Sequence, residues 1–243
     1  MTLIQKMIEM NYDEKLADSL IRIGSVFVDE VAITMPQTKI KLDAVIKVKE
    51  SKKYVSRGAY KLLSALEEFL INPKDLVCLD VGSSTGGFTQ VLLEKGAKFV
   101  YALDVGTNQL EYKIRSDVRV KTLEKTNLKV INKSMFDQQI DLIVCDVSFI
   151  SLKHVFDVIS PLLKESSYFI ALIKPQYEAN SNDVSEGGFA KVELHEEIID
   201  KIIKYSESNF EFIKLKKSPI LGNKSKNIEY LSLFKRNKNE QMN

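Results

Sequence analysis

Reactive and metal-binding side chains are scarce in this sequence. It contains two cysteines, two histidines and no tryptophan among 243 residues. Cys78 and Cys145 both lie within apolar runs typical of buried strands, which predicts small core residues rather than a disulfide or a metal pair. Since only His154 and His195 are available as further zinc ligands of this kind, the composition disfavours zinc chemistry, and we expect no metal.

Long apolar segments are also missing. No run approaches the roughly 18 to 20 residues that cross a bilayer, so we expect no stable membrane insertion. The first residues lack the basic segment, apolar core and cleavage site of a secretory signal. We therefore expect a cytoplasmic protein.

Charge is distributed unevenly along the chain. The formal net charge is only +2, yet residues 51–61 contain four basic and no acidic side chains, and residues 201–243 contain ten basic and four acidic ones. Because these two segments carry more positive charge than the whole chain does, the rest of the chain, including its centre, has a negative net charge. Basic segments around such a centre predict a polyanion bound at the edges of a site. The alternative is surface charge that only aids solubility, and we favour it for the lysines after Phe234.

Residues 1–50 have the pattern of a small separate module. Two short helical patterns precede a hairpin-like alternation and a last strand, at residues 3–10, 13–23, 25–34 and 43–48. A unit of this size buries a marginal core. A polar, basic linker follows at residues 51–60, and residues 237–243 form a polar tail.

The chain is organised around residues 76–95. Five of the six residues at 76–81 are apolar, as in a strand buried on both faces, and a glycine-rich turn at 82–87 leads into a helical pattern. Glycines allow a sharp turn and close approach of a nucleotide-like ligand. Asp80 would repel a diphosphate, whereas it would attract a cationic ligand such as S-adenosylmethionine. Asp104 ends the next strand, where such folds bind ribose hydroxyls.

The sequence thus predicts an S-adenosylmethionine site. An ordinary glycine turn at the end of an α/β strand is the alternative reading. The candidate cofactor-binding residues are Asp80, Gly82, Ser83, Ser84, Thr85, Gly86, Gly87, Phe88, Asp104, Val105 and Asp146.

Helical and strand-like segments alternate through the rest of the chain. Expected helices lie at 59–70, 109–114, 152–163 and 192–206, and expected strands at 99–103, 118–123, 140–145, 168–173, 210–215 and 228–234. This alternation predicts an α/β doubly wound parallel sheet with ligands at the carboxyl ends of its strands. Asp146 and Lys174 follow two of these strands, and Glu229 lies at the start of the last one.

Several motifs together resemble the TlyA family, which joins an RNA-binding module to an FtsJ-like ribose methyltransferase. They are SRGAYKL, CLDVGSSTGGFTQVLL, ALDVG, DLIVCDVSFISL, LIKPQYEA and EYLSLF. The resemblance implies a Rossmann-like domain at residues 61–236 with a mostly parallel seven-stranded sheet. It also implies methylation of ribose 2′-hydroxyls in ribosomal RNA, free or in ribosomal subunits, with S-adenosylmethionine. Some members carry the older name hemolysin.

The same resemblance assigns functional residues. Residues 1–50, with ADSLIRIGSVFVDEVA at their centre, resemble the small RNA-binding module of a small-subunit ribosomal protein. The linker bases Lys52, Lys53 and Arg57 would then contact RNA. The family's Lys-Asp-Lys-Glu tetrad maps onto Lys61, Asp146, Lys174 and Glu229.

Methyl transfer to a hydroxyl requires positioning and the removal of one proton. We expect Lys174 to be the general base, with its pKa lowered by burial and by the nearby cation of Lys61. Asp146 would orient Lys174, and Glu229 would hold the lysines or the ribose.

Other functions stay open at this point. A noncatalytic RNA-binding protein on a methyltransferase fold is the main alternative. A membrane-acting hemolysin is disfavoured by the missing spanning segments, and an NAD-dependent reductase by the altered glycine pattern. The sequence makes no prediction of oligomeric state.

Overall fold

The computed structural model describes every residue except 11, 13, 23, 49–53, 223–226 and 239–243. The chain divides into two compact units, Met1–Lys53 and Tyr54–Asn243. The second unit starts before the predicted domain boundary at residue 61, because Tyr54 is buried in its core and the Val55 N–H donates to Gln90 Oε1 at 2.9 Å. Two of the predicted RNA-binding residues, Lys52 and Lys53, lie outside the described residues.

The N-terminal unit packs two helices on a small antiparallel sheet with strand order β2-β1-β3. Its elements are α1 (Leu3–Glu9), α2 (Glu14–Arg22), β1 (Val26–Val28), β2 (Val31–Ile33) and β3 (Ile46–Val48). Thr2 and Gln5 form a capping box at the start of α1. The core of this unit is small and includes Leu3, Met7 and Ile21.

A seven-stranded sheet with order β6-β5-β4-β7-β8-β10-β9 forms the centre of the second unit. Its strands are β4 (Val77–Val81), β5 (Phe99–Leu103), β6 (Val120–Leu123), β7 (Ile140–Cys145), β8 (Leu163–Ile173), β9 (Phe210–Lys217) and β10 (Tyr230–Arg236). The strands from β6 to β8 pair in parallel, while β10 is antiparallel to both β8 and β9. The prediction of a mostly parallel, Rossmann-like sheet is confirmed.

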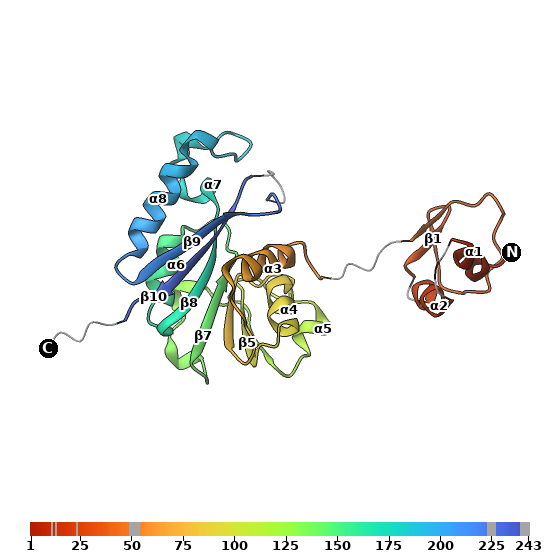
Figure 1. Cartoon of the computed structure of the whole chain (residues 1–243), viewed down its shortest axis with the longest axis horizontal. Helices are drawn as coiled ribbons and strands as arrows, with labels where there is room; N and C mark the ends of the chain where they lie inside the picture. Colours follow the sequence, from red (N-terminus) through yellow and green to blue (C-terminus); the bar gives the residue numbers. More distant parts are fainter. Residues whose placement is uncertain (11, 13, 23, 49–53, 223–226, 239–243) are drawn as a thin grey trace. The chain divides into compact units, whose positions relative to one another are not determined.

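Helices cover both faces of this sheet (Figure 1). They are α3 (Gly58–Phe69), α4 (Gly87–Glu94), α5 (Tyr112–Arg115), α6 (Leu152–Ile159), α7 (Pro175–Glu178) and α8 (His195–Ser206), with short 3₁₀ turns at Leu128–Val130, Lys133–Met135, Ser181–Asp183 and Val192–Leu194. Along β4, Cys78 packs with the α3 and α4 side, whereas Leu79 packs with the α6 and α8 side. Because alternate side chains of β4 point to opposite faces, this one strand packs into the hydrophobic cores on both sides of the sheet.

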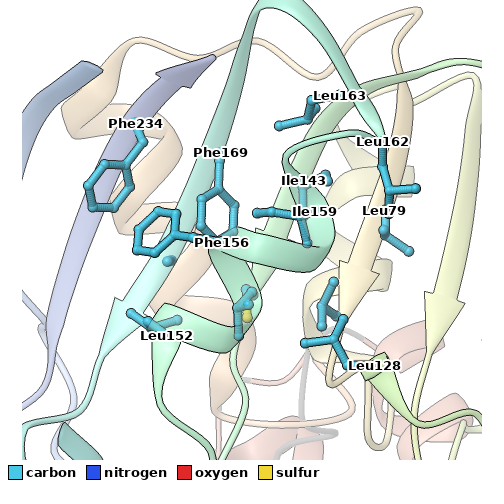
Figure 2. Close-up of a cluster of buried hydrophobic side chains, with 14 of the residues drawn as sticks. Leu79, Leu128, Ile143, Leu152, Phe156, Ile159, Leu162, Leu163, Phe169 and Phe234 are labelled. Carbon is cyan, nitrogen blue, oxygen red and sulfur yellow. The ribbon is translucent and has the colours of Figure 1, made fainter. Parts of the chain in front are cut away.

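Phe156 of α6 lies at the centre of the core on the α6 and α8 side (Figure 2). Its ring centroid is 5.5 Å from that of Phe169 on β8, 5.4 Å from Phe210 on β9 and 4.9 Å from Phe234 on β10. One helix side chain therefore contacts three adjacent strands, including the antiparallel strand β10.

The helix predicted over residues 152–163 is shorter than expected. It ends at Ile159, and Leu163 already begins β8. Pro161 has no N–H with which to continue the helix. The apolar Leu162 and Leu163 fitted the helical pattern because both are buried in the same core that α6 contacts.

Candidate functional site

The sheet topology brings the predicted site residues to one edge. Asp104, Asp146 and Lys174 directly follow the parallel strands β5, β7 and β8, so they lie at the carboxyl edge. Glu229 directly precedes β10, which runs antiparallel and therefore starts at that same edge. Lys61 comes from the first turns of α3 and is buried.

Four charged side chains form an alternating ion-pair cluster at this edge. Lys61 Nζ lies 2.6 Å from Glu229 Oε2 and 3.5 Å from Asp146 Oδ2. Lys174 Nζ lies 2.6 Å from Asp146 Oδ1 and donates to Ser148 Oγ at 3.0 Å. The structure thus brings together the whole predicted tetrad, with the Asp146 carboxylate shared by both lysines.

The cluster shifts the ionisation of its members. Burial of Asp146 opposes its charge, yet Lys174 and Lys61 together hold the pKa of this carboxyl below its usual range. Burial also disfavours the charged form of Lys174, but the Asp146 and Glu229 carboxylates outweigh burial and raise the pKa of Lys174. The expectation of a lowered Lys174 pKa is therefore wrong for the free protein, because the nearest charges to this amine are negative.

The glycine turn packs directly against the tetrad. Gly82 has φ +83°, and a Cβ there would lie 2.9 Å from the carbonyl oxygen of Asp146. The N–H groups of Gly82 and Ser83 donate to the Leu103 carbonyl at 2.9 and 3.0 Å. A side chain at Gly82 would thus push the turn away from Asp146, which makes glycine necessary at this position.

Asp104 is held in place by the turn. Its Oδ2 accepts from the Ser84 N–H at 2.8 Å and its Oδ1 from the Gly106 N–H at 2.7 Å. Val105 beside it is 68% exposed. A carboxylate fixed by two backbone donors next to an open apolar surface is suited to a ribose and its attached base.

Asp80 is fully buried below the turn. Its Oδ2 accepts from Thr89 Oγ1 at 2.7 Å, whereas Oδ1 has no hydrogen-bond partner among the described residues. Burial raises the pKa of Asp80 to about 7. An unpartnered buried carboxylate oxygen beside a glycine turn fits a ligand that carries an ammonium or sulfonium group.

Three of the predicted ligand-binding residues differ from one another in their surroundings. The Phe88 side chain points into the core with Leu62 and Val91, so it supports the turn from behind instead of facing a ligand. Arg57 is exposed at the residue before α3. Thr85 is half-buried, and its carbonyl accepts from the Glu111 N–H at 3.2 Å.

Three functional candidates were missed in the sequence. Thr89, the partner of Asp80, stands out only as a polar residue on the apolar face of α4. Ser148 contacts Lys174 from an ordinary loop. Phe149 is 87% exposed, has φ +65° and places its ring 5.0 Å from that of Tyr177. A large aromatic residue with positive φ on the surface is a signal that only the backbone reveals.

In the part of the chain that the structure describes, no helix is long and apolar enough to cross a membrane. No group of three or more His, Cys, Asp or Glu side chains there is arranged to hold a metal ion.

The chain is similar to known methyltransferases and hemolysin-named proteins. Residues 54–236 match the model of the FtsJ-like methyltransferase family. The chain is 47% identical to Hemolysin A of Brachyspira hyodysenteriae over 90% of this chain and 92% of that protein. It is 37% identical to the 16S/23S rRNA (cytidine-2'-O)-methyltransferase TlyA of Mycobacterium tuberculosis over 88% of this chain and 81% of that one.

A solved structure agrees with these relatives. The crystal structure of a provisionally named hemolysin from Lactococcus lactis superimposes with a TM-score of 0.73 at 42% identity, covering 76% of this chain and 89% of that one. Fold, motifs and relatives thus agree over nearly the whole length. The chain therefore belongs to the TlyA family of FtsJ-like methyltransferases.

Proposed function

We propose that this protein transfers a methyl group from S-adenosylmethionine to a ribose 2′-hydroxyl of ribosomal RNA. The observation that carries the proposal is the Lys61, Asp146, Lys174 and Glu229 cluster, which packs against the glycine turn through Asp146. The relative TlyA is named as a methyltransferase that acts on cytidine 2′-oxygens of 16S and 23S rRNA. This substrate would place the activity in the cytoplasm.

The glycine turn at 82–87, with Asp80 and Asp104 beside it, would hold S-adenosylmethionine. When bound, this cofactor supplies a methyl group on a positively charged sulfur. Asp80 would complement the charge of the ligand, and Asp104 would accept hydrogen bonds from its ribose. S-adenosylmethionine should therefore raise the melting temperature of the protein, whereas NAD should not.

Lys174 is the residue that we propose as general base. Lys174 is 7% exposed and its amine is held by Asp146 and Ser148, so the amine has a fixed position from which to contact a ribose hydroxyl. Because the carboxylates raise its pKa, Lys174 must lose a proton before it can accept one. Lys61 and Glu229 would hold the ribose, and Lys61 together with Lys174 would keep Asp146 charged.

The parts of the substrate RNA beyond the reacting ribose would be bound outside the tetrad. The exposed ring of Phe149, three residues after Asp146, offers a stacking surface for a base. Residues 1–50 and the linker bases Lys52, Lys53 and Arg57 would position the RNA without taking part in the chemistry.

A transfer assay tests this function. Purified protein, ribosomal subunits and methyl-labelled cofactor should give labelled RNA, and the backbone bond 3′ to the labelled nucleotide should resist alkali because its 2′-oxygen is blocked. Lys174→Ala should lower turnover at least about 100-fold, with Lys98→Ala, an exposed lysine directly before β5, as the matched control. Tight RNA binding without transfer would instead identify a noncatalytic RNA-binding protein.

A further inference from the structure

Two loops that follow neighbouring strands carry half of the tetrad. The loop at 147–151 follows Asp146 and leads into α6, and α7 follows Lys174. The paired register of β7 and β8 ends at Cys145 and Ala171. Sheet hydrogen bonds between these two strands therefore stop before Asp146 and Lys174. Each residue is held instead from its other neighbouring strand: the Asp146 N–H donates to the Val81 carbonyl at 3.1 Å, and Ile173, directly before Lys174, pairs with Tyr230 of β10. Contacts between the two loops add a direct connection between the two residues.

Glu178, at the end of α7, makes the outermost connection between these loops. Its Oε2 accepts from Ser151 Oγ at 2.6 Å, and its Oε1 accepts from the Leu152 N–H at 2.8 Å. Ser151 is itself the N-cap of α6 and accepts from the Lys153 N–H at 3.2 Å. One carboxylate thus satisfies a backbone donor of α6 and orients the residue that caps it.

Between Glu178 and the tetrad the two loops touch at further points. The Tyr177 ring contacts Phe149, with centroids 5.0 Å apart, and Lys174 Nζ lies 5.9 Å from the centroid of Tyr177. Lys174 also donates to Ser148. The contacts run in the same order along both loops, from the ion pair outward to Glu178. Together they hold the two loops side by side.

We propose that Glu178 is a positioning residue for methyl transfer, because its carboxylate ties the loop after Asp146 to the loop after Lys174 and so sets the geometry of that ion pair. The role of the pair in catalysis rests on the proposed function. Both carboxylate oxygens of Glu178 are engaged by Ser151 and Leu152, so its assigned role is to position other residues.

A simple helix cap is the competing explanation. Capping alone predicts that loss of Glu178 lowers stability and leaves turnover and the titration of Lys174 unchanged. A positioning role predicts that both of these change, since misplacing catalytic groups by about 1 Å can cost on the order of 100-fold in rate.

The variants Glu178→Ala and Glu178→Gln test the proposal in the full chain. Alanine removes both hydrogen bonds, whereas glutamine keeps an acceptor for Leu152 and loses the charge, which guards against failure of the alanine variant to fold. Glu67→Gln, an exposed carboxylate on α3, is the matched control. The measurements are kcat and KM with ribosomal subunits, calorimetric cofactor affinity, melting temperature, and NMR titration of the Lys174 side chain.

We expect kcat to fall at least about tenfold in Glu178→Ala and less in Glu178→Gln, with cofactor affinity and RNA KM within about threefold of the parent. The pKa of Lys174 should fall as the amine moves away from Asp146. Unchanged kcat and an unchanged Lys174 titration would overturn the proposal. If the parent transfers no methyl group, the proposed function fails, while the Lys174 titration still decides whether Glu178 positions the ion pair.

Discussion

Asp80 combines two properties that are costly in a protein interior. It is fully buried, and one of its oxygens lacks a partner among the described residues. Because its folded pKa of about 7 lies above the ordinary value, its protonation stabilises the free protein at low pH, and that contribution is lost as the pH rises through about 7. Such a group is poised to gain from a cationic ligand.

Cofactor affinity should therefore depend on pH. If binding requires ionised Asp80, affinity should rise about tenfold between about pH 6 and about pH 8, because the free carboxyl must lose its proton. Calorimetry across this range checks the prediction. In Asp80→Asn, which keeps a partner for Thr89, the affinity should be weaker and nearly independent of pH. A pH-dependent affinity in that variant would assign the effect to another group.

Lys174 makes a second prediction at the level of a single residue. Only the neutral amine accepts a proton, and the raised pKa keeps this form scarce near neutral pH. Turnover at saturating cofactor and RNA should thus increase with pH into the alkaline range. Lys174→Arg should stay inactive, since a guanidinium remains protonated. A flat pH profile, or activity in the arginine variant, would reduce Lys174 to holding the ribose by charge.

At the scale of secondary structure, α6 connects the sheet edge that carries the tetrad to the core. Its first residues take part in the contacts of Glu178. Its Phe156 is buried against the rings of Phe169 on β8 and Phe234 on β10 (Figure 2) and against an aromatic ring of β9. The β10 strand in turn is preceded by Glu229. The aromatic cluster therefore supports three of the elements that carry or border the tetrad.

Phe156→Ala should lower the free energy of unfolding of the large unit by about 3 to 5 kcal/mol, the usual cost of a large cavity in a packed core. Urea denaturation followed by circular dichroism measures this change, since the chain has no tryptophan to report by fluorescence. Tyr112→Ala, at a residue 80% exposed, should change the free energy by less than about 0.5 kcal/mol. A small effect of Phe156→Ala would mean that the rings repack around the gap.

At the scale of the whole molecule, the proposal assigns RNA positioning to the N-terminal unit and methyl transfer to the second unit. In the N-terminal unit several basic side chains already have acidic neighbours: Lys6 lies 3.2 Å from Glu9, and Arg22 lies 2.7 Å from Asp18. This pairing limits the net attraction of the unit for phosphates.

Deletion of residues 1–53 should weaken binding to ribosomal subunits and make the remaining affinity less dependent on salt, because fewer phosphates are neutralised. Cofactor affinity should stay within a few-fold, since the turn and its carboxylates belong to the second unit. Filter binding at several salt concentrations and calorimetry check the two parts. Equal affinity of the truncated and full-length chains at matched salt would remove RNA binding from the role of the N-terminal unit.

Local patterns in the sequence were enough to identify the strand, glycine turn and helix around Asp80, the alternation of elements and the family motifs. These features depend on spacing within short segments, where apolar periodicity and turn-forming residues act directly. Helix 152–163 was predicted too long for the same reason, since buried residues on both sides of Pro161 continue one apolar pattern.

Long-range packing decided which charged side chains of the candidate site pair with one another and how their pKa values shift. That Lys61 binds Glu229, that one carboxylate is shared by two lysines, and that the pKa of Lys174 rises all depend on which strand ends meet. The outward Phe149 and the Glu178 connection depend on loop conformations that no periodicity encodes. The physical reason is that charge interactions are set by distances of a few ångströms between segments far apart in the chain, and only the folded sheet brings those segments together.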